Sequence, residues 1–309
     1  MPNDYHIPAL LEQTIEGLHI KTDGIYVDAT FGGGGHSRAI LEQLGKKGKL
    51  FSFDQDIAAL TNQIDDERWE FIHGNFRYVA NYMDYYGVEQ IDGLVADLGV
   101  SFYDFDTAQR GFSFRFAGPL DMRMNTQAKK TASDILNTYT EEELARIFAL
   151  YGELADAKSL ARKIKQAQRV ERTEQLVAIV TGRREKVALA DGQEVAVEPF
   201  ERKKLSQVFQ ALRIEVNDEL GALQELLQTS KTLVKSGGYV AILSYHSLED
   251  RMVKNFFASG NVQGEKQKDF YGNLLKDFEG GNKVIVPSQA EIEQNPRSRS
   301  AKLRVARKI

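Results

Sequence analysis

The stretch IYVDATFGGGGHS at residues 25–37 decides how this chain folds. Its apolar start predicts a strand, its four glycines predict a tight loop, and the segment Ser37–Leu44 that follows predicts a helix. Glycine has no Cβ to keep a ligand away from the backbone, so a loop of this kind at a helix start is typical of a binding site. The alternative is a glycine-rich turn without a ligand.

The glycines do not match the dinucleotide fingerprint. That fingerprint needs glycines at positions i, i+2 and i+5, whereas the fifth residue after Gly32 is Ser37 and the fifth after Gly33 is Arg38. The predicted strand ends instead on an acidic residue, Asp28. An acid ahead of the loop favours a ligand with a cationic amino-acid moiety, such as S-adenosylmethionine, over a pyrophosphate.

Outward from the loop, short apolar runs alternate with amphipathic stretches. Further strands are predicted at 50–53, 69–72, 91–96, 239–243, 283–286 and 303–305. Strand, helix and strand at this spacing predict a parallel sheet built from βαβ units, hence an α/β fold.

A helical block interrupts this pattern. Residues 140–180 have helical periodicity, with a capping box at Thr140 and Glu143, and Glu201–Leu227 continues in the same style. We therefore expect a discontinuous α/β core at 1–104 and 215–309, with a mostly helical insertion at 105–214 that recognises the substrate.

Composition narrows the class of protein. The chain has 309 residues, 42% hydrophobic and 27% charged, which is typical of a soluble globular protein. It has no apolar run of 18 residues, no secretory signal pattern and no cysteine, so we expect a cytoplasmic protein without disulfides or cysteine-based metal sites, and no metal site is predicted. Net charge is −11 over residues 1–106, +5 over 107–214 and +2 over 215–309. Such asymmetry suits a local polyanion-binding face, or simply solvated helix surfaces.

Several polar residues come directly after predicted strands. Asp54 stands 22 residues after Gly32 and is placed to accept the ribose hydroxyls of an adenosine ligand, with Asp56 as the rival carboxylate. Phe76, after the third strand, packs on the adenine or belongs to the core. Asp97 ends the fourth strand, where cofactor and substrate would meet at the carboxyl edge of the sheet.

Other candidates concern catalysis and RNA. His246 follows the strand at 239–243 and is a second catalytic candidate, whereas Ser247 and Asp250 are expected to form a capping box. Phe102 and Tyr103 could stack an unpaired base, or pack in the core. The remaining candidates for RNA contact are Arg110, Arg297 and Arg299, although arginines near the C-terminus also suit a bland edge strand.

Taken together, these blocks resemble the ribosomal RNA small subunit methyltransferase H family, which methylates the exocyclic N4 of a cytosine in the decoding region of 16S ribosomal RNA. The resemblance runs almost end to end, through HIPALL at 6–11, DATFGGGGHS at 28–37, DLGVS at 97–101, RGFSFRFAGPLDMRM at 110–124, FQALRIEVNDEL at 209–220, SYHSLEDRMVK at 244–254 and NPRSRSAKLRV at 295–305. It implies a seven-stranded class I (Rossmann-like) methyltransferase fold, S-adenosylmethionine as donor and a helical insertion that helps hold the substrate.

The resemblance also implies the cofactor-binding residues, which are Gly34, Gly35, His36, Asp54, Phe76, Asp97 and Asp104. Asp104 replaces the glutamine that is usual in the family. Asp97 is expected to accept a hydrogen bond from cytosine N4 or to position the cofactor, with His246 taking the excess proton. Gly34→Val is expected to abolish cofactor binding while the fold survives.

Two other functions stay open at this point. A DNA cytosine-N4 or adenine-N6 methyltransferase would have a Pro-Pro-aromatic stretch after the acid of the fourth strand, and Leu98-Gly99-Val100 does not supply it. A non-catalytic RNA-binding module would explain the charge asymmetry but not the acids at three strand ends. The expected partner is 16S ribosomal RNA or the small ribosomal subunit, without a membrane, and the protein is a monomer or a homodimer.

Overall fold

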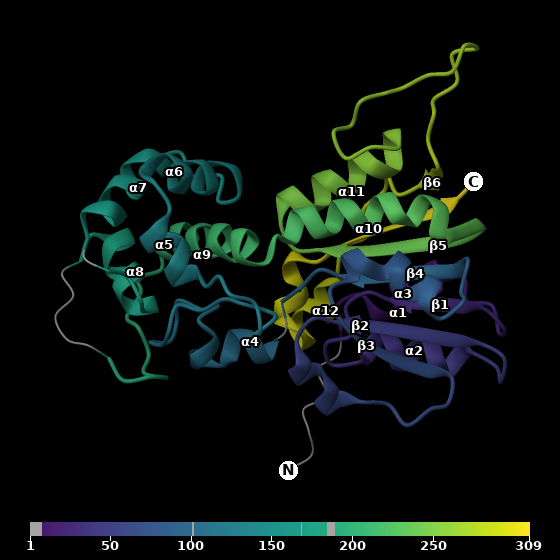
Figure 1. Ribbon diagram of the computed structural model, residues 1–309, viewed down its shortest axis with the longest axis horizontal. Helices are drawn as coiled ribbons and strands as arrows, with labels where there is room; N and C mark the ends of the chain where they lie inside the picture. Colours follow the sequence, from purple (N-terminus) through teal and green to yellow (C-terminus); the bar gives the residue numbers. More distant parts are fainter. Residues whose placement is uncertain (1–7, 101, 168, 184–188) are drawn as a thin grey trace. The chain divides into compact units, whose positions relative to one another are not determined.

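The computed structural model describes residues 8–100, 102–167, 169–183 and 189–309, with only the backbone of Phe102 and Tyr103 (Figure 1). The chain divides into two compact units. The first comprises Met1–Gly99 and Leu220–Ile309, and the second Val100–Glu219. None of the described helices is both long and apolar enough to cross a bilayer.

A seven-stranded sheet forms the centre of the first unit, in the order β3-β2-β1-β4-β5-β7-β6. The strands are β1 (Ile25–Asp28), β2 (Lys49–Asp54), β3 (Trp69–His73), β4 (Ile91–Asp97), β5 (Val234–Ser244), β6 (Phe278–Gly280) and β7 (Lys302–Lys308). Strands β1 to β5 all run parallel to one another, and β7 runs antiparallel to both of its neighbours, β5 and β6. The predicted α/β class is confirmed. The strand order reverses beside β1, so β1 and β4 lie at the switch point where open α/β sheets bind ligands.

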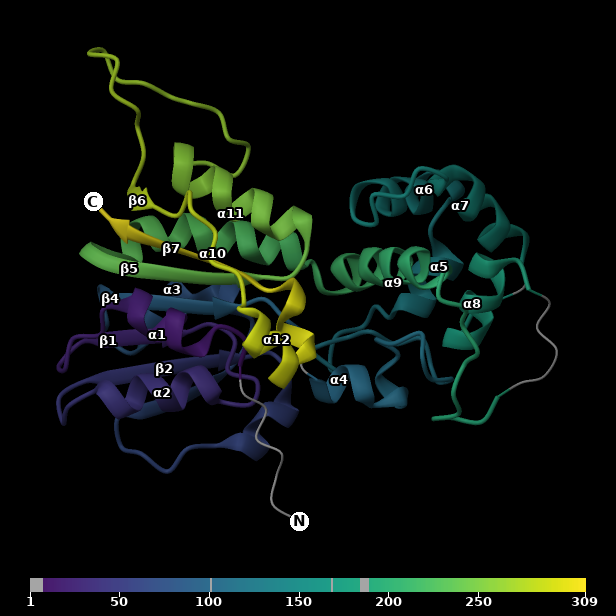
Figure 2. The ribbon, with the colours of Figure 1, turned by 180° about the vertical axis from the view of Figure 1, so that it is seen from behind.

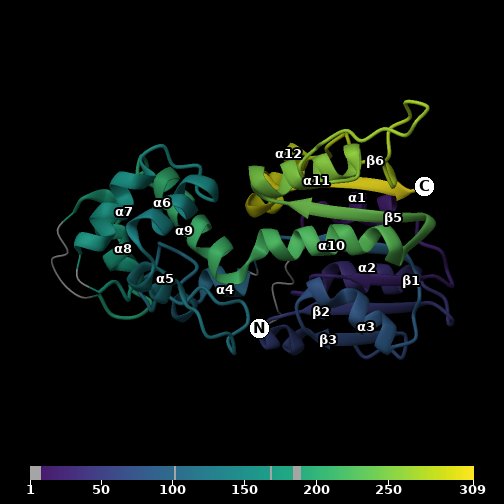
Figure 3. The ribbon, with the colours of Figure 1, turned by 45° about the horizontal axis from the view of Figure 1, so that its top comes forward.

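Helices cover both faces of this sheet because its strands are apolar on both sides. One face packs against α3 (Val79–Tyr85), α10 (Glu219–Leu233) and α11 (Ser247–Ser259) (Figure 3). The other packs against α1 (Leu11–Leu18) and α2 (Gly35–Gln43), which lie in front of the sheet in Figure 2. The remaining short elements of this unit are η1 (Ile57–Asn62), η2 (Phe76–Tyr78), α12 (Gln289–Gln294) and η4 (Pro296–Ser300).

One predicted strand is wrong. Residues 283–286 contribute only an isolated bridge between Ile285 and Leu303. The sixth strand is β6, which pairs with the end of β7 and buries a single large side chain, Phe278. A strand of three residues is too short to show alternation in the sequence.

The second unit is helical. It comprises α4 (Phe102–Asp106), η3 (Ala108–Arg110), α5 (Ala132–Thr138), α6 (Glu141–Leu150), α7 (Ala157–Gln166), α8 (Thr173–Thr181) and α9 (Arg202–Asn217). Its core is separate from that of the sheet and is formed by apolar faces of α5 to α9. The predicted capping box at Thr140 and Glu143 opens α6. The predicted helix at 201–227 is two helices, because Asp218 adopts a left-handed φ of 47° between α9 and α10.

Candidate active site

The glycine loop joins β1 to α2 and is shaped by backbone conformation. Gly32 and Gly34 have φ values of 51° and 76°, a region that other residues rarely adopt. Gly33 is different: a Cβ at this position would meet no described atom within 4 Å. A Cβ at Gly34 would instead come within 2.4 Å of the Arg38 guanidinium and 2.9 Å of the Phe31 ring. Gly34→Val is therefore expected to strain the loop as well as to affect a ligand, whereas Gly33 faces a space free of described atoms.

Asp28, the last residue of β1, forms hydrogen bonds to both ends of the glycine loop. Its side chain is 1% exposed, and its carboxylate accepts hydrogen bonds from the Thr30 N–H at 3.1 Å and the Ser37 hydroxyl at 2.7 Å. Burial raises the pKa of Asp28, and the neighbouring His36 ring opposes that shift. The buried Asp28 carboxylate thus connects the end of β1 to the first turn of α2.

His36 lies at the start of α2 with a buried polar atom. The residue is 4% exposed, and its Nε2 has no hydrogen-bond partner among the described residues. Most buried polar atoms in native structures have a partner, so this Nε2 is available to a group beyond the described residues. The orphaned Nε2 and the open space at Gly33 fit a polar ligand that lies along the loop.

Asp54 and Asp56 have different roles although they are two residues apart. Asp54 ends β2, and its carboxylate accepts from the Gly32 N–H and from the Asp56 N–H, both at 2.8 Å. Burial raises the pKa of Asp54 to about 6. Asp56 caps η1 by accepting from the Ala58 N–H at 2.9 Å. The geometry therefore favours Asp54 as the ligand-binding carboxylate, because it is tied directly to the glycine loop.

Phe76 begins η2, after β3. Its ring is partly buried and packs against the apolar cluster on the α3 face of the sheet. The Asn75 side chain caps η2 by accepting from the Arg77 N–H at 3.0 Å, and its amide donates to the Gln55 side chain at 3.0 Å. Phe76 is thus a core residue with one partly open side, and its contact with adenine stays a prediction.

Asp97 ends β4 and is held by three neighbouring segments. Its N–H donates to the Thr30 hydroxyl at 2.6 Å, and its Oδ1 accepts from the Gly99 N–H at 3.1 Å. The Tyr245 hydroxyl forms a hydrogen bond with the same carboxylate. Burial first, and then this carboxylate, raise the pKa of Tyr245, so the phenol stays protonated and acts as the donor.

Sequence reasoning missed Tyr245 and chose its neighbour His246. Strands β4 and β5 are parallel, and Asp97 aligns with Leu243. Tyr245, two residues beyond that register, therefore reaches the carboxyl edge beside Asp97. Knowledge of the strand pairing would have found it, but no local pattern does.

The sequence of this chain is similar to those of known proteins over almost its whole length. The family model described as the MraW methylase family matches residues 3–309. The chain belongs to the MraW methylase family. Two relatives, each named ribosomal RNA small subunit methyltransferase H, come from Parabacteroides distasonis, at 51% identity over 99% of this chain and 98% of the relative, and from Bacteroides thetaiotaomicron, at 52% over 98% and 97%. Among solved structures, an rRNA methylase from Streptococcus thermophilus is similar at a TM-score of 0.41 and 15% identity, covering 98% of this chain and 99% of that one.

His246 is the N-cap of α11. Its Nε2 lies 3.0 Å from a Glu249 carboxylate oxygen, and the other carboxylate oxygen accepts from the Tyr245 N–H at 2.9 Å. The predicted capping box of Ser247 and Asp250 is wrong, because His246 and Glu249 form the box that opens α11, and Asp250 pairs with the buried Arg304 at 2.7 Å. His246 therefore stiffens the turn that positions Tyr245, and its role as a proton acceptor stays a prediction.

The remaining candidate residues lie away from the glycine loop and Asp97. Within the helical unit, Asp104 and Arg110 form a salt bridge of 3.0 Å, with side chains only 4% and 13% exposed. Arg110 also donates to the Arg123 carbonyl at 3.0 Å, so it holds its own loop. The side chains of Phe102 and Tyr103 lie outside the described residues. Arg297 and Arg299 are exposed on η4, in the sheet unit.

Proposed function

We propose that this protein transfers a methyl group from S-adenosylmethionine to the exocyclic N4 of a cytosine in the decoding region of 16S ribosomal RNA, within the small subunit or the RNA alone. Half of its residues are identical, over nearly the whole length, to proteins named ribosomal RNA small subunit methyltransferase H. The observation that supports the chemistry best is the placement of Asp97 between the strand that leads into the glycine loop and Tyr245. Because ribosomal subunits are in the cytoplasm, this is where we place the enzyme.

The residues that fit the cofactor surround the loop. We assign the ribose hydroxyls to Asp54, the adenine to Phe76, and the backbone at Gly33, Gly34 and Gly35, with the orphaned His36 Nε2, to the polar remainder. When bound, S-adenosylmethionine supplies a methyl group that is already electrophilic. The protein therefore mainly has to align the nucleophile for an in-line attack.

Asp97 is the residue that we assign to the nucleophile. The lone pair of cytosine N4 is delocalised into the ring, and a carboxylate that accepts a hydrogen bond from N4–H localises it and stabilises the positive charge that develops on nitrogen. As the new N–C bond forms and the methyl–sulfur bond breaks, N4 must lose one proton, and we assign this proton to Asp97, with His246 as the alternative acceptor. Tyr245 acts as a positioning residue, because its hydroxyl and the Gly99 N–H fix the orientation of the carboxylate.

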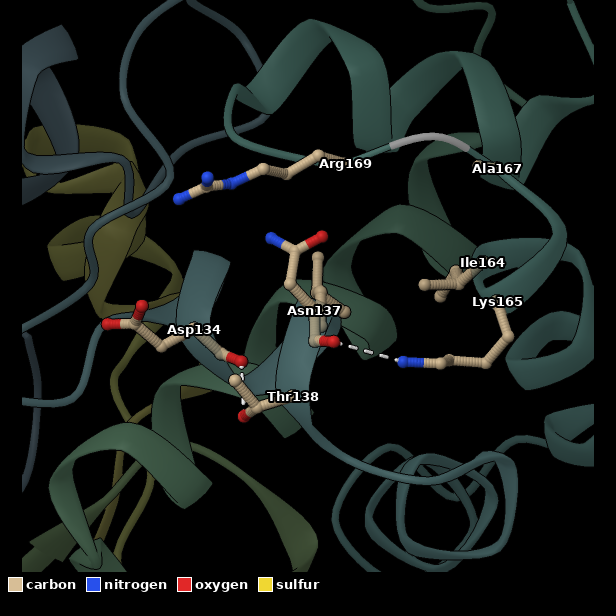
Figure 4. Close-up of a pocket in the computed structure, with 8 residues that line it drawn as sticks. Asp134, Asn137, Thr138, Ile164, Lys165, Ala167 and Arg169 are labelled. Atoms are coloured by element: carbon tan, nitrogen blue, oxygen red, sulfur yellow. Dashed lines mark hydrogen bonds between the residues drawn. The ribbon is translucent and has the colours of Figure 1, made fainter.

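We further propose that the helical unit binds the RNA backbone. Helix α7 has four basic residues and no acidic residue, and its exposed face presents Lys158, Arg162, Lys163 and Lys165. A pocket beside it is lined by Lys165 from α7, by Arg169 after that helix, and by Asp134, Asn137 and Thr138 from α5 (Figure 4). Lys165 donates to the Asn137 carbonyl at 3.2 Å, and Arg169, which is 74% exposed, pairs with Glu171 at 2.9 Å. Basic side chains of this kind contact phosphates and position RNA without reading its sequence.

The test is methyl transfer from labelled S-adenosylmethionine to three substrates, all prepared from cells that lack the protein: small ribosomal subunits, naked small-subunit RNA and DNA. Mass spectrometry of the digested product should identify N4-methylcytidine in the RNA. Methylated DNA with unmodified RNA would favour a DNA methyltransferase. Binding of RNA without any methyl transfer to the three substrates would favour a non-catalytic RNA-binding protein.

A further inference from the structure

An arm projects from the sheet unit between α11 and β6, at residues 261–277 (Figure 1, Figure 2, Figure 3). Its two sides are joined by a bridge between Lys268 and Leu274 and by a hydrogen bond of 2.8 Å from the Leu275 N–H to the Gln267 carbonyl. The arm belongs to none of the binding or catalytic assignments made above.

The tip of the arm has a defined conformation. The Asp269 carboxylate accepts from the Asn273 N–H at 2.8 Å and from the Tyr271 N–H at 2.9 Å, and the Asn273 side chain donates to it at 2.9 Å. These hydrogen bonds lower the pKa of Asp269. Gly272 closes the turn with a φ of 87°. The turn therefore presents residues 270 and 271 in a fixed orientation.

Two aromatic side chains occupy this tip. Phe270 is 98% exposed and Tyr271 85%, the two highest values among the large hydrophobic side chains of the described residues. Their ring centroids are 5.6 Å apart, edge to face. Neither ring contributes burial to the fold, and adjacent exposed aromatics on an ordered turn are typical of a contact surface. Lys266 and Lys268 are exposed on the same arm.

We propose that Phe270 and Tyr271 stack on unpaired bases of the RNA that this enzyme binds. Every base has a π-face, so stacking on aromatic rings suits single-stranded RNA of varied sequence, whereas the bases of a duplex are hidden. Lys266 and Lys268 supply positive charge for the phosphates of such a strand, on an arm that also carries Glu265 and Asp269. The inference rests on the proposed function only for the identity of the RNA.

Fluorescence anisotropy with a labelled single-stranded oligoribonucleotide of about 12 nucleotides, and with its duplex, tests the proposal. The double variant Phe270→Ala/Tyr271→Ala should raise the Kd for the single strand by about tenfold, and the Kd for the duplex should not change. Phe270→Leu/Tyr271→Leu should lose as much affinity, because leucine keeps the apolar surface but has no ring. The exchange Phe270→Tyr/Tyr271→Phe should retain the wild-type Kd. Tyr85→Ala removes a tyrosine that is 82% exposed elsewhere in this unit and serves as the matched control.

Three outcomes would overturn the proposal. The first is a wild-type Kd in the alanine double variant. The second is wild-type affinity in the leucine double variant, which would indicate apolar docking. The third is a lower molecular mass in solution for the alanine double variant than for the wild type, which would indicate that the rings contact a second copy of the chain. Methylation of small ribosomal subunits is measured in parallel. If the wild-type protein methylates no RNA, the proposed function fails, whereas the oligonucleotide measurements still decide the role of the arm.

Discussion

At the scale of single residues, hydrogen bonds show that Asp56 is a capping acid and support the proposal that Asp54 is the ligand-binding one. Sequence alone favours Asp54 over Asp56 only by its position after the strand. The structure adds that Asp56 is occupied as an N-cap and that Asp54 contacts the N–H of Gly32 in the glycine loop. Local caps of this kind depend on where η1 begins, which the sequence does not show.

The first prediction compares these two acids. Asp54→Ala should weaken binding of S-adenosylhomocysteine by about 1–3 kcal/mol, because charge-assisted hydrogen bonds to the ribose are lost. Asp56→Ala should lower the thermal midpoint through loss of the cap, at a cost of about 1 kcal/mol, with little change in ligand affinity. Titration calorimetry and thermal unfolding measure both effects, and the opposite ranking of affinities would assign the ribose to Asp56.

The first prediction extends to pH, because the same carboxyl group titrates. Burial raises the pKa of Asp54 from 3.8 to about 6, so in the free protein the group favours folding at low pH, and this contribution is lost as pH rises through about 6. Ligand binding has the opposite sign, because ribose hydroxyls donate best to the ionised form. Affinity for S-adenosylhomocysteine should therefore fall below about pH 6 in the wild type, and Asp54→Asn should show no such fall. Equal pH profiles for the two proteins would contradict the assignment.

The second prediction concerns Asp97 and Tyr245. Asp97→Asn keeps the size of the side chain but removes its charge, and single-turnover methylation of small-subunit RNA should fall by roughly 10²–10³-fold. Cofactor affinity should change little, since an interaction made mainly in the transition state affects rate rather than ground-state binding. Tyr245→Phe, which removes only the positioning hydroxyl, should lower the rate by roughly tenfold. Loss of affinity with normal turnover at saturating cofactor would assign Asp97 to the cofactor alone.

The third prediction uses two adjacent glycines. Gly33→Val adds a side chain where the described atoms leave open space, so the protein should keep its stability to within about 1 kcal/mol but lose cofactor binding. Gly34→Val must accommodate a φ of 76° and contacts with Phe31 and Arg38, so it should also destabilise the fold by about 1–3 kcal/mol. Denaturant unfolding and calorimetry separate the two effects. A Gly33→Val protein with wild-type affinity would show that the ligand does not lie along this loop.

At the scale of elements, the sequence was a good guide where apolar runs were long and buried. Strands β1 to β4 begin and end within one residue of their predictions, since each is a short, mostly apolar run, interrupted only by Ser52 in β2, Glu70 in β3, and Asp92 and Gly93 in β4. Strand β5 extends from Val234, five residues before the prediction, because its first half contains polar residues and two glycines. Tyr245 was not found because its partner Asp97 is distant in sequence, and only the pairing of β4 with β5 brings them together.

The fourth prediction tests α7 as an RNA-binding element. Lys158→Gln/Lys163→Gln should weaken binding of small-subunit RNA and reduce the slope of log Kd against log salt by about 1–2, because two phosphate contacts are lost. The matched control is Lys46→Gln/Lys47→Gln, which removes two exposed charges from the loop after α2 in the sheet unit. Electrophoretic mobility shifts over a range of salt concentrations measure both proteins. Equal salt slopes for the two variants would exclude these α7 lysines from the RNA contact.

At the scale of the whole molecule, the residues assigned to the cofactor and to N4 come from one unit, although half of that unit follows the insertion in sequence. Asp28, His36, Asp54, Asp97 and Tyr245 all belong to the sheet unit, whereas Asp104 belongs to the helical one. The order of strands and helices predicts a core that is divided at 104/105 and 214/215. The exact division, after Gly99 and before Leu220, depends on tertiary contacts and not on any punctuation in the sequence.

The last prediction follows from the two separate cores. The sheet unit has its own apolar clusters on both faces of the sheet, and the helical unit has another, so each can unfold cooperatively by itself. Calorimetry of the full chain should then show two transitions. Leu226→Ala, in the sheet core, and Leu160→Ala, in the helical core, should each lower only one of them, since loss of a buried leucine costs about 2–5 kcal/mol. S-adenosylhomocysteine at about 100 times its Kd adds about 2.7 kcal/mol to the state that binds it, and it should raise only the transition that Leu226→Ala lowers. If the ligand raises both transitions together, the helical unit contributes to the cofactor site, and Asp104 becomes the first residue to test.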